Sequence, residues 1–560
     1  IYQSERTRGS STDSTTFTNN FGRTWDTLAN YKNVNPVNWQ DETFGRTGLL
    51  QTHNLSLNGG GKKLSYNLGY TFNGDKAIVL NSNYKRHLLN FKSDYKISKK
   101  LKIGVSTRYI NQEVMGAGVS DAKGSSYNRL RNSVKYRPFL SIGQDIDDSD
   151  PIADPNVGNG LNLVNPIKLA NAEYRQKRTE TYNGSFNLSY EIVKNISFRS
   201  TFGYDYTNLI DQQYSDSITP FAIIQGGAKA IAGLDTSNRR TITNSNVLSY
   251  SVNNFKGKHD IGVIVGEETY DLRTEARSSL FRNFPAFTSY SAAFKETTLG
   301  VPFTGYPKLN KARYTNMSYF GRINYGYEDK YLFTFNLRSD GASKFAPGKQ
   351  WGFFPAGSFA WRAKNEKFLK NVDFISDLKV RAGFGQVGNN RISDYLFLTT
   401  YKNDGNYFYG INNNAILAYY SSGLVNQDLK WESTVNRNLG IDISLFNGRF
   451  DLNVDYYSNA SKDLLLNVPV ASTYGYSTQL QNIGKTSNKG VDIQLSAIIL
   501  KSQNGLNWNA NFNISSNKNK IVALGVNQNY FYPAASWGVS GQPSDYIAKI
   551  GYPVGSDRKS

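Results

Sequence analysis

Apolar and polar residues alternate strictly along many short stretches of this chain. Within residues 181–192, Tyr182, Phe186 and Tyr190 fall on one face of an extended strand, whereas Asn183 and Asn187 fall on the other. An alternation of period two predicts a β-strand whose two faces meet different surroundings. The same pattern recurs in residues 196–206, 438–445, 449–456, 491–497 and 508–514. The chain is therefore expected to be all-β.

Turn residues separate these stretches at two kinds of spacing. Asn447 and Gly448 lie between two alternating stretches, and Asn-Gly is the strongest short signal for a β-hairpin. Further short turns are expected near residues 59–63, 98–100, 194–195, 254–258, 328–330 and 502–505, with a somewhat longer link at 364–377. Longer connections are expected at residues 112–173, 207–239, 271–311, 389–429 and 458–481, with briefer ones near 74–83 and 341–350.

Short and long connections therefore alternate along the chain. Outer-membrane β-barrels are built in this way, with tight periplasmic turns at one rim and long extracellular loops at the other. Eight short links indicate about 16 strands. Tyrosine and phenylalanine crowd the strand ends, which is typical of the aromatic girdles at the two membrane interfaces. We predict a transmembrane antiparallel β-barrel.

The composition agrees with this prediction and removes several other protein classes. Charged residues make up 19% of the chain, below the roughly 25% of a typical soluble domain, and there is no cysteine. The longest apolar run, residues 415–420, is far shorter than the roughly 20 residues of a spanning helix. The net charge of +20 is spread along the chain, so nucleic-acid binding is not expected. The chain begins at Ile1 without a signal peptide, which is typical of an internal fragment.

Candidate motifs for cofactor or metal chemistry fail on their context. Residues 383–388 match G-x-G-x-x-G, but the surrounding stretches are β and no helix follows, so no cofactor is expected. An acidic loop lacks the glycine and the bidentate glutamate of an EF-hand. We interpret it as a solvated extracellular loop, and a loose calcium site is the alternative. That loop contains Asp145, Asp147, Asp148 and Asp150. No pairing of a nucleophile with a base can be argued, so an enzyme is not expected.

Several longer segments together resemble one family of membrane proteins. They include WQDE at residues 39–42, YLFTFNLRSDGASKF at 331–345, LKVRAGFGQVGN at 378–389, NGRFDLNVDYY at 447–457 and NIGKTSNKG at 482–490. In this order and spacing they resemble the SusC/RagA family of TonB-dependent outer-membrane transporters. The resemblance spans nearly the whole chain.

The resemblance implies a 22-strand barrel with an N-terminal plug and a segment that engages TonB–ExbB–ExbD. It also implies a SusD-like surface lipoprotein as partner and oligosaccharide or peptide as cargo. Residues 1–560 would then be a partial barrel domain of an outer-membrane nutrient importer, in contact with outer-membrane lipid, without the plug and the C-terminal strands. A plug-less porin or adhesin-type barrel, and a soluble secreted carbohydrate-binding β-protein, remain as alternatives.

Two regions are candidates for contact with cargo. The segment DGASKF lies at an outward strand end and contains Asp340, Ser343, Lys344 and Phe345. A second region places tyrosines among asparagine and glycine, a composition suited to stacking on sugar rings or packing along a peptide. Its members are Tyr407, Tyr409, Tyr419 and Tyr420.

Overall fold

The computed structural model describes residues 36–116, 129–136, 164–303, 305–402, 408–411, 414–502, 505–525, 529–532 and 546–557. One antiparallel sheet of 17 strands dominates it. The two-residue β9 (Val301–Pro302) pairs only with the end of β8, and the other 16 strands pair in chain order. Within the described residues β1 and β23 do not pair with each other. The sequence prediction of about 16 antiparallel strands is confirmed.

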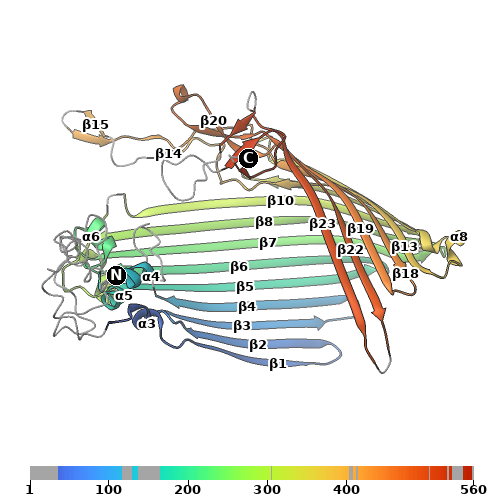
Figure 1. Cartoon of the computed structure of the whole chain (residues 1–560), viewed down its shortest axis with the longest axis horizontal. Coiled ribbons are helices and arrows are strands. Elements are labelled where there is room, and N and C mark those ends of the chain that lie inside the picture. Colours follow the sequence, from blue (N-terminus) through green and yellow to red (C-terminus); the bar gives the residue numbers. More distant parts are fainter. Residues whose placement is uncertain are drawn as a thin grey trace, which may run out of the picture.

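The 16 strands are joined as consecutive hairpins (Figure 1). They are β1 (Leu49–Gly60), β2 (Leu64–Lys76), β3 (Asn83–Lys96), β4 (Leu101–Met115), β5 (Glu173–Val193), β6 (Ile196–Ser215), β7 (Ile231–Phe255), β8 (His259–Arg282), β10 (Lys308–Tyr327), β11 (Tyr331–Ala342), β12 (Trp351–Arg362), β13 (Ile375–Asn389), β18 (Glu432–Leu445), β19 (Phe450–Lys462), β22 (Lys485–Leu500) and β23 (Trp508–Ala523). Asn447 and Gly448 both have positive φ, as the predicted hairpin turn requires.

Several strands are longer than the sequence pattern indicated. The pattern placed strand ends at residues 207 and 239, but β6 continues to Ser215 and β7 begins at Ile231. β8 and β10 likewise extend past the predicted limits of 271 and 311. A strand needs about 9–11 residues to cross a membrane, and β7 has 25. Beyond the apolar band both faces of a strand meet water, so the alternation fades while main-chain pairing continues.

Short elements occupy the connections. The helices are α3 (Trp39–Phe44), α4 (Arg129–Lys135), α5 (Pro166–Ala172), α6 (Pro220–Gly226), α7 (Tyr290–Lys295) and α8 (Lys367–Lys370), with 3₁₀ turns η2 (Thr297–Leu299), η3 (Ala363–Asn365) and η4 (Ser472–Tyr474). Small hairpins pair β14 (Tyr401–Lys402) with β17 (Tyr420–Ser421), β15 (Phe408–Ile411) with β16 (Asn414–Leu417), and β20 (Leu465–Pro469) with β21 (Thr478–Asn482). Near the C-terminus β24 (Tyr530–Phe531), β25 (Tyr546–Lys549) and β26 (Ser556–Asp557) form a small sheet.

None of the helices in the described part of the chain has the length and apolar character needed to cross a membrane.

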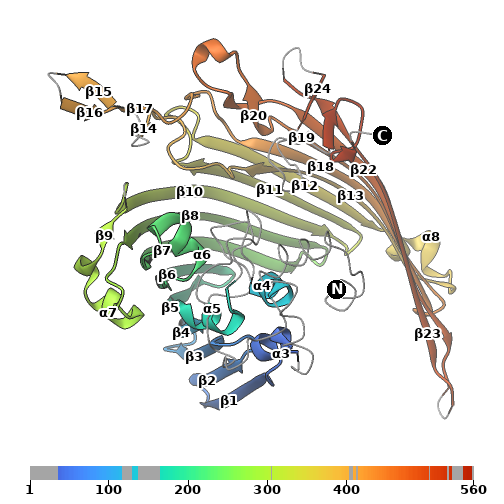
Figure 2. The ribbon, with the colours of Figure 1, turned by 60° about the vertical axis from the view of Figure 1, so that its left-hand side comes forward.

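The two faces of the large sheet differ in chemistry. Phe186 and Leu439 are 42% and 58% exposed on one face, together with many other large apolar side chains. The opposite face carries polar contacts across neighbouring strands, such as Thr201 Oγ1 to Asn187 Oδ1 at 2.9 Å. Arg129 of α4 pairs with Glu173 on this polar face, and Figure 2 shows α4 and α5 on the concave side of the curved sheet. The polar face therefore lines the lumen, and the apolar face points outward.

An ion-pair cluster links neighbouring short turns at the rim opposite the long loops. Glu328 accepts hydrogen bonds from Lys258 Nζ and Lys330 Nζ at 2.7 and 2.9 Å. Lys330 also approaches Glu366 at 3.7 Å, and Glu366 accepts a hydrogen bond from the Tyr331 hydroxyl at 2.6 Å. The cluster thus connects the β7–β8 turn, the β10–β11 turn and the link before α8.

We expect this turn cluster to weaken in acid. Hydrogen bonds from Lys258 and Lys330 lower the pKa of Glu328 from 4.5 to about 2. The ionised carboxylate is therefore favoured in the folded state, and its contribution is complete above pH 4.5 and disappears as the pH falls towards 2. The Glu328 amide donates to the Lys258 carbonyl, and the Arg362 amide donates to the Lys330 carbonyl. Hydrogen exchange at these two amides, corrected for the intrinsic rates, measures the local stability of the cluster. The protection of both amides should fall between pH 5 and 2.5. The control is Glu328→Gln, in which the protection should not depend on pH.

Candidate functional site

A cavity of about 490 Å³ lies in the lumen wall where β6, β7, β8 and β10 run side by side. We call it the wall cavity. Its volume lies within the roughly 300–1,000 Å³ of small-molecule sites. Its lining is Thr201, Thr243, Asn244, Ser245, Glu268, Thr269, Tyr270, Tyr314, Asn316 and Ser318. Short hydroxyl side chains on β6 and β7 are thus followed by larger side chains on β8 and β10, which leaves a hollow between them.

Two tyrosines form the aromatic part of the wall cavity. The ring centroids of Tyr270 and Tyr314 lie 5.7 Å apart with the planes tilted by 55°. Asn390 Nδ2 donates to the Tyr314 hydroxyl at 3.0 Å, and the Lys344 ammonium lies 4.8 Å from the centre of the Tyr314 ring. Lys344 is itself held by the Ile392 carbonyl, to which Nζ donates at 2.8 Å. The ring of Tyr314 is therefore fixed from behind by the loops that follow β11 and β13.

Asp340 of the predicted DGASKF segment lies beside the polar part of the cavity, on the same face of the sheet as Ser318 and paired with it across the β10–β11 ladder. Its carboxylate accepts a hydrogen bond from Ser318 Oγ, and it is held by Arg338 Nε at 2.9 and 3.0 Å. Arg338 Nη2 also donates to Glu268 Oε2 at 3.0 Å. Ser318 and Glu268 both line the cavity. Asp340 and Lys344 thus contact residues of the wall cavity, and their contact with cargo stays a prediction.

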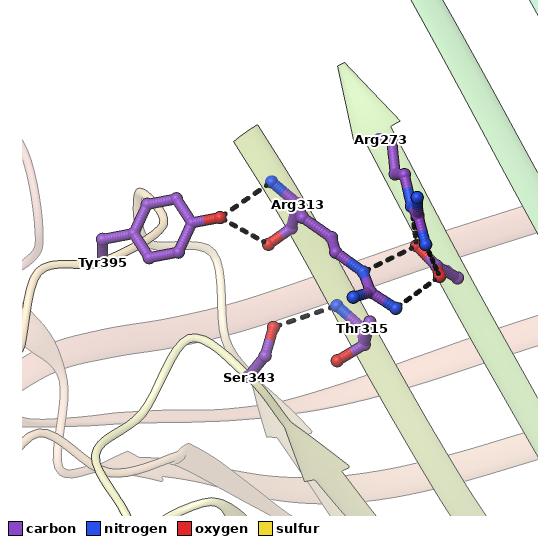
Figure 3. Close-up of polar contacts among 6 residues, drawn as sticks. Arg273, Arg313, Thr315, Ser343 and Tyr395 are labelled. Carbon is purple, nitrogen blue, oxygen red and sulfur yellow. Dashed lines mark hydrogen bonds and ion pairs between the residues drawn. The ribbon is translucent and has the colours of Figure 1, made fainter. Parts of the chain in front are cut away.

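Ser343 and Phe345 have structural contacts in the same segment. Ser343 Oγ accepts from the Thr315 amide at 2.9 Å, and the Ser343 amide donates to the Thr315 carbonyl at 3.0 Å (Figure 3). These bonds continue the β10–β11 ladder past the end of β11. Phe345 is 0% exposed and packs with Leu429, with its ring 5.5 Å from that of Trp431. Because the ring is fully buried, the structure leaves no surface of Phe345 for direct contact with cargo.

The second predicted region lies apart from the wall cavity, on hairpins that reach away from the large sheet (Figure 1). Tyr419 is 62% exposed, and the Tyr420 ring has the Lys402 ammonium 5.0 Å from its centre. Tyr409 is part of β15, where its backbone pairs with Ile416. Tyr407 lies outside the described residues. The structure does not bring these tyrosines together with Asp340 and Lys344, and their contact with cargo stays a prediction.

The acidic loop cannot be placed, because Asp145, Asp147, Asp148 and Asp150 all lie outside the described residues. In the part of the chain that the structure describes, no three His, Asp or Glu side chains gather as a metal site would require.

Sequence reasoning missed Tyr270, Tyr314 and Glu268. Each lies in a strand whose alternation identifies the inward face but not the neighbour across the sheet. Only the register, which pairs Tyr314 with Leu272 and Ser318 with Glu268, brings them around one hollow. The available signal in the sequence was the presence of tyrosines at positions that alternation places on the polar face.

Comparison with known proteins agrees with this architecture. The family described as "TonB dependent receptor-like, beta-barrel" matches residues 124–556. The chain belongs to this family. As a TonB-dependent receptor barrel it is an outer-membrane protein, with its apolar face towards lipid.

Individual relatives point in the same direction. The TonB-dependent receptor P3 of Formosa agariphila is 29% identical over 537 residues, which are 93% of this chain and 50% of that protein. The TonB-dependent receptor SusC of Bacteroides thetaiotaomicron is 27% identical over 544 residues, 93% of this chain and 52% of SusC. The chain thus spans about half the length of the curated relatives it matches. The predicted resemblance to the SusC/RagA family is confirmed.

The RagAB peptide transporter is a similar solved structure. It matches with a TM-score of 0.75 at 21% identity, covering 93% of this chain and 55% of that chain. The receptor for ferripyoverdine from Pseudomonas aeruginosa matches less closely, with a TM-score of 0.50 at 12% identity. At these identities the likeness concerns the fold alone.

Proposed function

We propose that this chain is the barrel wall of an outer-membrane importer that takes up oligosaccharides or peptides. The observation that carries the proposal is the wall cavity, a polar hollow with two tyrosine rings in the lumen of a TonB-dependent receptor barrel. Hydroxyl, amide and carboxylate groups hydrogen-bond to sugar hydroxyls or peptide groups, and tyrosine rings supply an apolar surface with a polar tip. The site is thus suited to binding and passing on a polar cargo.

The proposal includes partners outside this chain. Import would be driven through TonB–ExbB–ExbD, engaged by an N-terminal segment, with a plug closing the barrel until cargo is bound. A SusD-like lipoprotein would cover the extracellular rim. Similarity to SusC and to RagAB supports this arrangement.

Removing both cavity tyrosines should reduce uptake. Aromatic contacts are each worth about 0.5–1.5 kcal/mol, so Tyr270→Ala with Tyr314→Ala should lower uptake at sub-saturating cargo roughly tenfold. Initial rates are measured in cells producing the full-length protein, with panels of labelled oligosaccharides and oligopeptides, with and without TonB. Tyr319→Ala is the control, since Tyr319 lies on the outward face and stacks on Trp351.

Two results would contradict the proposal. Uptake that persists unchanged without TonB would indicate a passive barrel. Uptake of every panel member at the wild-type rate in the double variant would remove the wall cavity from the cargo path.

A further inference from the structure

Three arginines lie side by side on the outward face of the sheet. Arg240 of β7 pairs across the ladder with Arg273 of β8, and Arg273 pairs with Arg313 of β10. In their strands they share a face with the exposed apolar residues Leu248, Val265 and Ile323, an even number of positions away. We call these three residues the arginine row. Like charges directly opposite each other destabilise a sheet, so the row requires anionic partners.

The chain itself supplies too few of them. Asp271 accepts from Arg313 Nη2 at 2.8 Å and, more distantly, from Arg273 Nη2 at 3.4 Å (Figure 3). Glu275 lies two positions beyond Arg273 in β8, on the same face and nearer the extracellular end of the strand. It pairs with Arg277 at 2.9 Å and with Lys311 at 3.2 Å. Five cations thus face two carboxylates in this patch, and Arg240 forms no ion pair within the described residues. The surplus charge stays exposed, since the side chains of Arg273 and Arg313 are about half accessible.

The loops hold the row in place. β10 extends beyond the end of β11, so its main chain at Arg313 pairs with β8 on one side and has no strand on the side of β11. The Tyr395 hydroxyl takes over that role, accepting from the Arg313 amide at 3.0 Å and donating to its carbonyl at 3.2 Å (Figure 3). The strand therefore stays extended at this height, and less side-chain and backbone freedom is lost when an anion binds.

The height of the row indicates what it meets. The three arginines lie 14 or 15 residues along their strands from the short turns. With about 3.3 Å per residue and a tilt of 35–45°, this is roughly 35 Å above the turn rim, beyond an apolar band of about 25 Å. An outward-facing side chain at that level lies among the headgroups of the outer leaflet, which in an outer membrane is built from phosphorylated glycolipid.

We propose that the arginine row binds the phosphate groups of an outer-leaflet glycolipid. Guanidinium groups bind phosphate with two parallel hydrogen bonds, and they lose less hydration than ammonium groups when they do so. A glycolipid phosphate bound at the row would relieve the repulsion among the three arginines. The acyl chains of the same lipid would cover the apolar face below the row. The inference concerns the outer surface and is independent of the cargo proposed for the lumen.

Binding of defined lipids to the full-length protein in detergent tests the proposal. The probes are bis-phosphorylated lipid A, dephosphorylated lipid A and inorganic phosphate, followed by native mass spectrometry. We expect Arg240→Gln, Arg273→Gln and Arg313→Gln together to weaken lipid A binding at least tenfold. The matched control is Arg108→Gln, Arg199→Gln and Arg322→Gln, three arginines on the inner face, which should bind as the wild type does.

Three outcomes would overturn it: wild-type affinity in the outward triple variant, equal binding of dephosphorylated lipid A, or full competition by millimolar inorganic phosphate, which would make this a site for the free ion. The lipid comparison on wild-type protein decides the question even where the triple variant does not fold. The single variant Arg240→Gln, which disrupts no internal ion pair, gives a second measurement.

Discussion

Phe345→Ala is expected to destabilise the extracellular rim by about 3–5 kcal/mol, the usual cost of removing a buried phenylalanine ring. The ring is 0% exposed and fills the space between Ala342 and Leu429, with Trp431 beside it. Its loss leaves a cavity at the junction of the loops that follow β11 and precede β18. Hydrogen exchange at the Ala342 amide, which donates to the Gln350 carbonyl, reports the local free energy of opening.

The matched control is Phe287→Ala, because Phe287 is 87% exposed. A surface substitution of this kind changes the free energy of unfolding by no more than about 0.5 kcal/mol. If both variants exchange at the same rate as the wild type, Phe345 does not stabilise the loop that follows β11. A loss of cargo uptake in Phe345→Ala together with faster exchange would assign this residue an indirect role, through the position of Lys344 behind the wall cavity.

Phe186→Arg is expected to destabilise the folded barrel by about 2–4 kcal/mol, whereas Ser185→Arg should be nearly neutral. The two residues are adjacent on β5 but point to opposite faces. Phe186 is exposed to lipid, seven residues from the end of the strand and so near the middle of the bilayer. Ser185 lies on the opposite face, paired with Gly203, and faces the lumen, where a longer side chain can extend into water.

The measurement is the free energy of folding into lipid vesicles from urea, for the full-length protein and both variants. Similar losses for the two substitutions would mean that the two faces do not meet lipid and water as assigned. A greater loss for Ser185→Arg would reverse the assignment of the faces.

The order of the strands, their number and the face that each residue occupies could be predicted from the sequence. Alternation in residues 181–192 correctly placed Tyr182, Phe186 and Tyr190 on one face of the strand, because a side-chain period of two is a local property of an extended chain. The structure turns that face outward. The sorting of short and long connections was also readable, since turn chemistry is local. The lengths of β6, β7, β8 and β10 were underestimated, because alternation disappears where both faces are wet.

The wall cavity and the arginine row were decided by tertiary structure alone. Tyr270 lies 44 positions before Tyr314 in the chain, Arg240 lies 33 before Arg273, and Arg273 lies 40 before Arg313. What makes each pair neighbours is the register of β7, β8 and β10, and a shift of one residue would move every side chain to the opposite face. The sequence by itself thus determined which residues form strands and which face water. Cross-strand pairing over long separations, which no local pattern encodes, decided which residues meet.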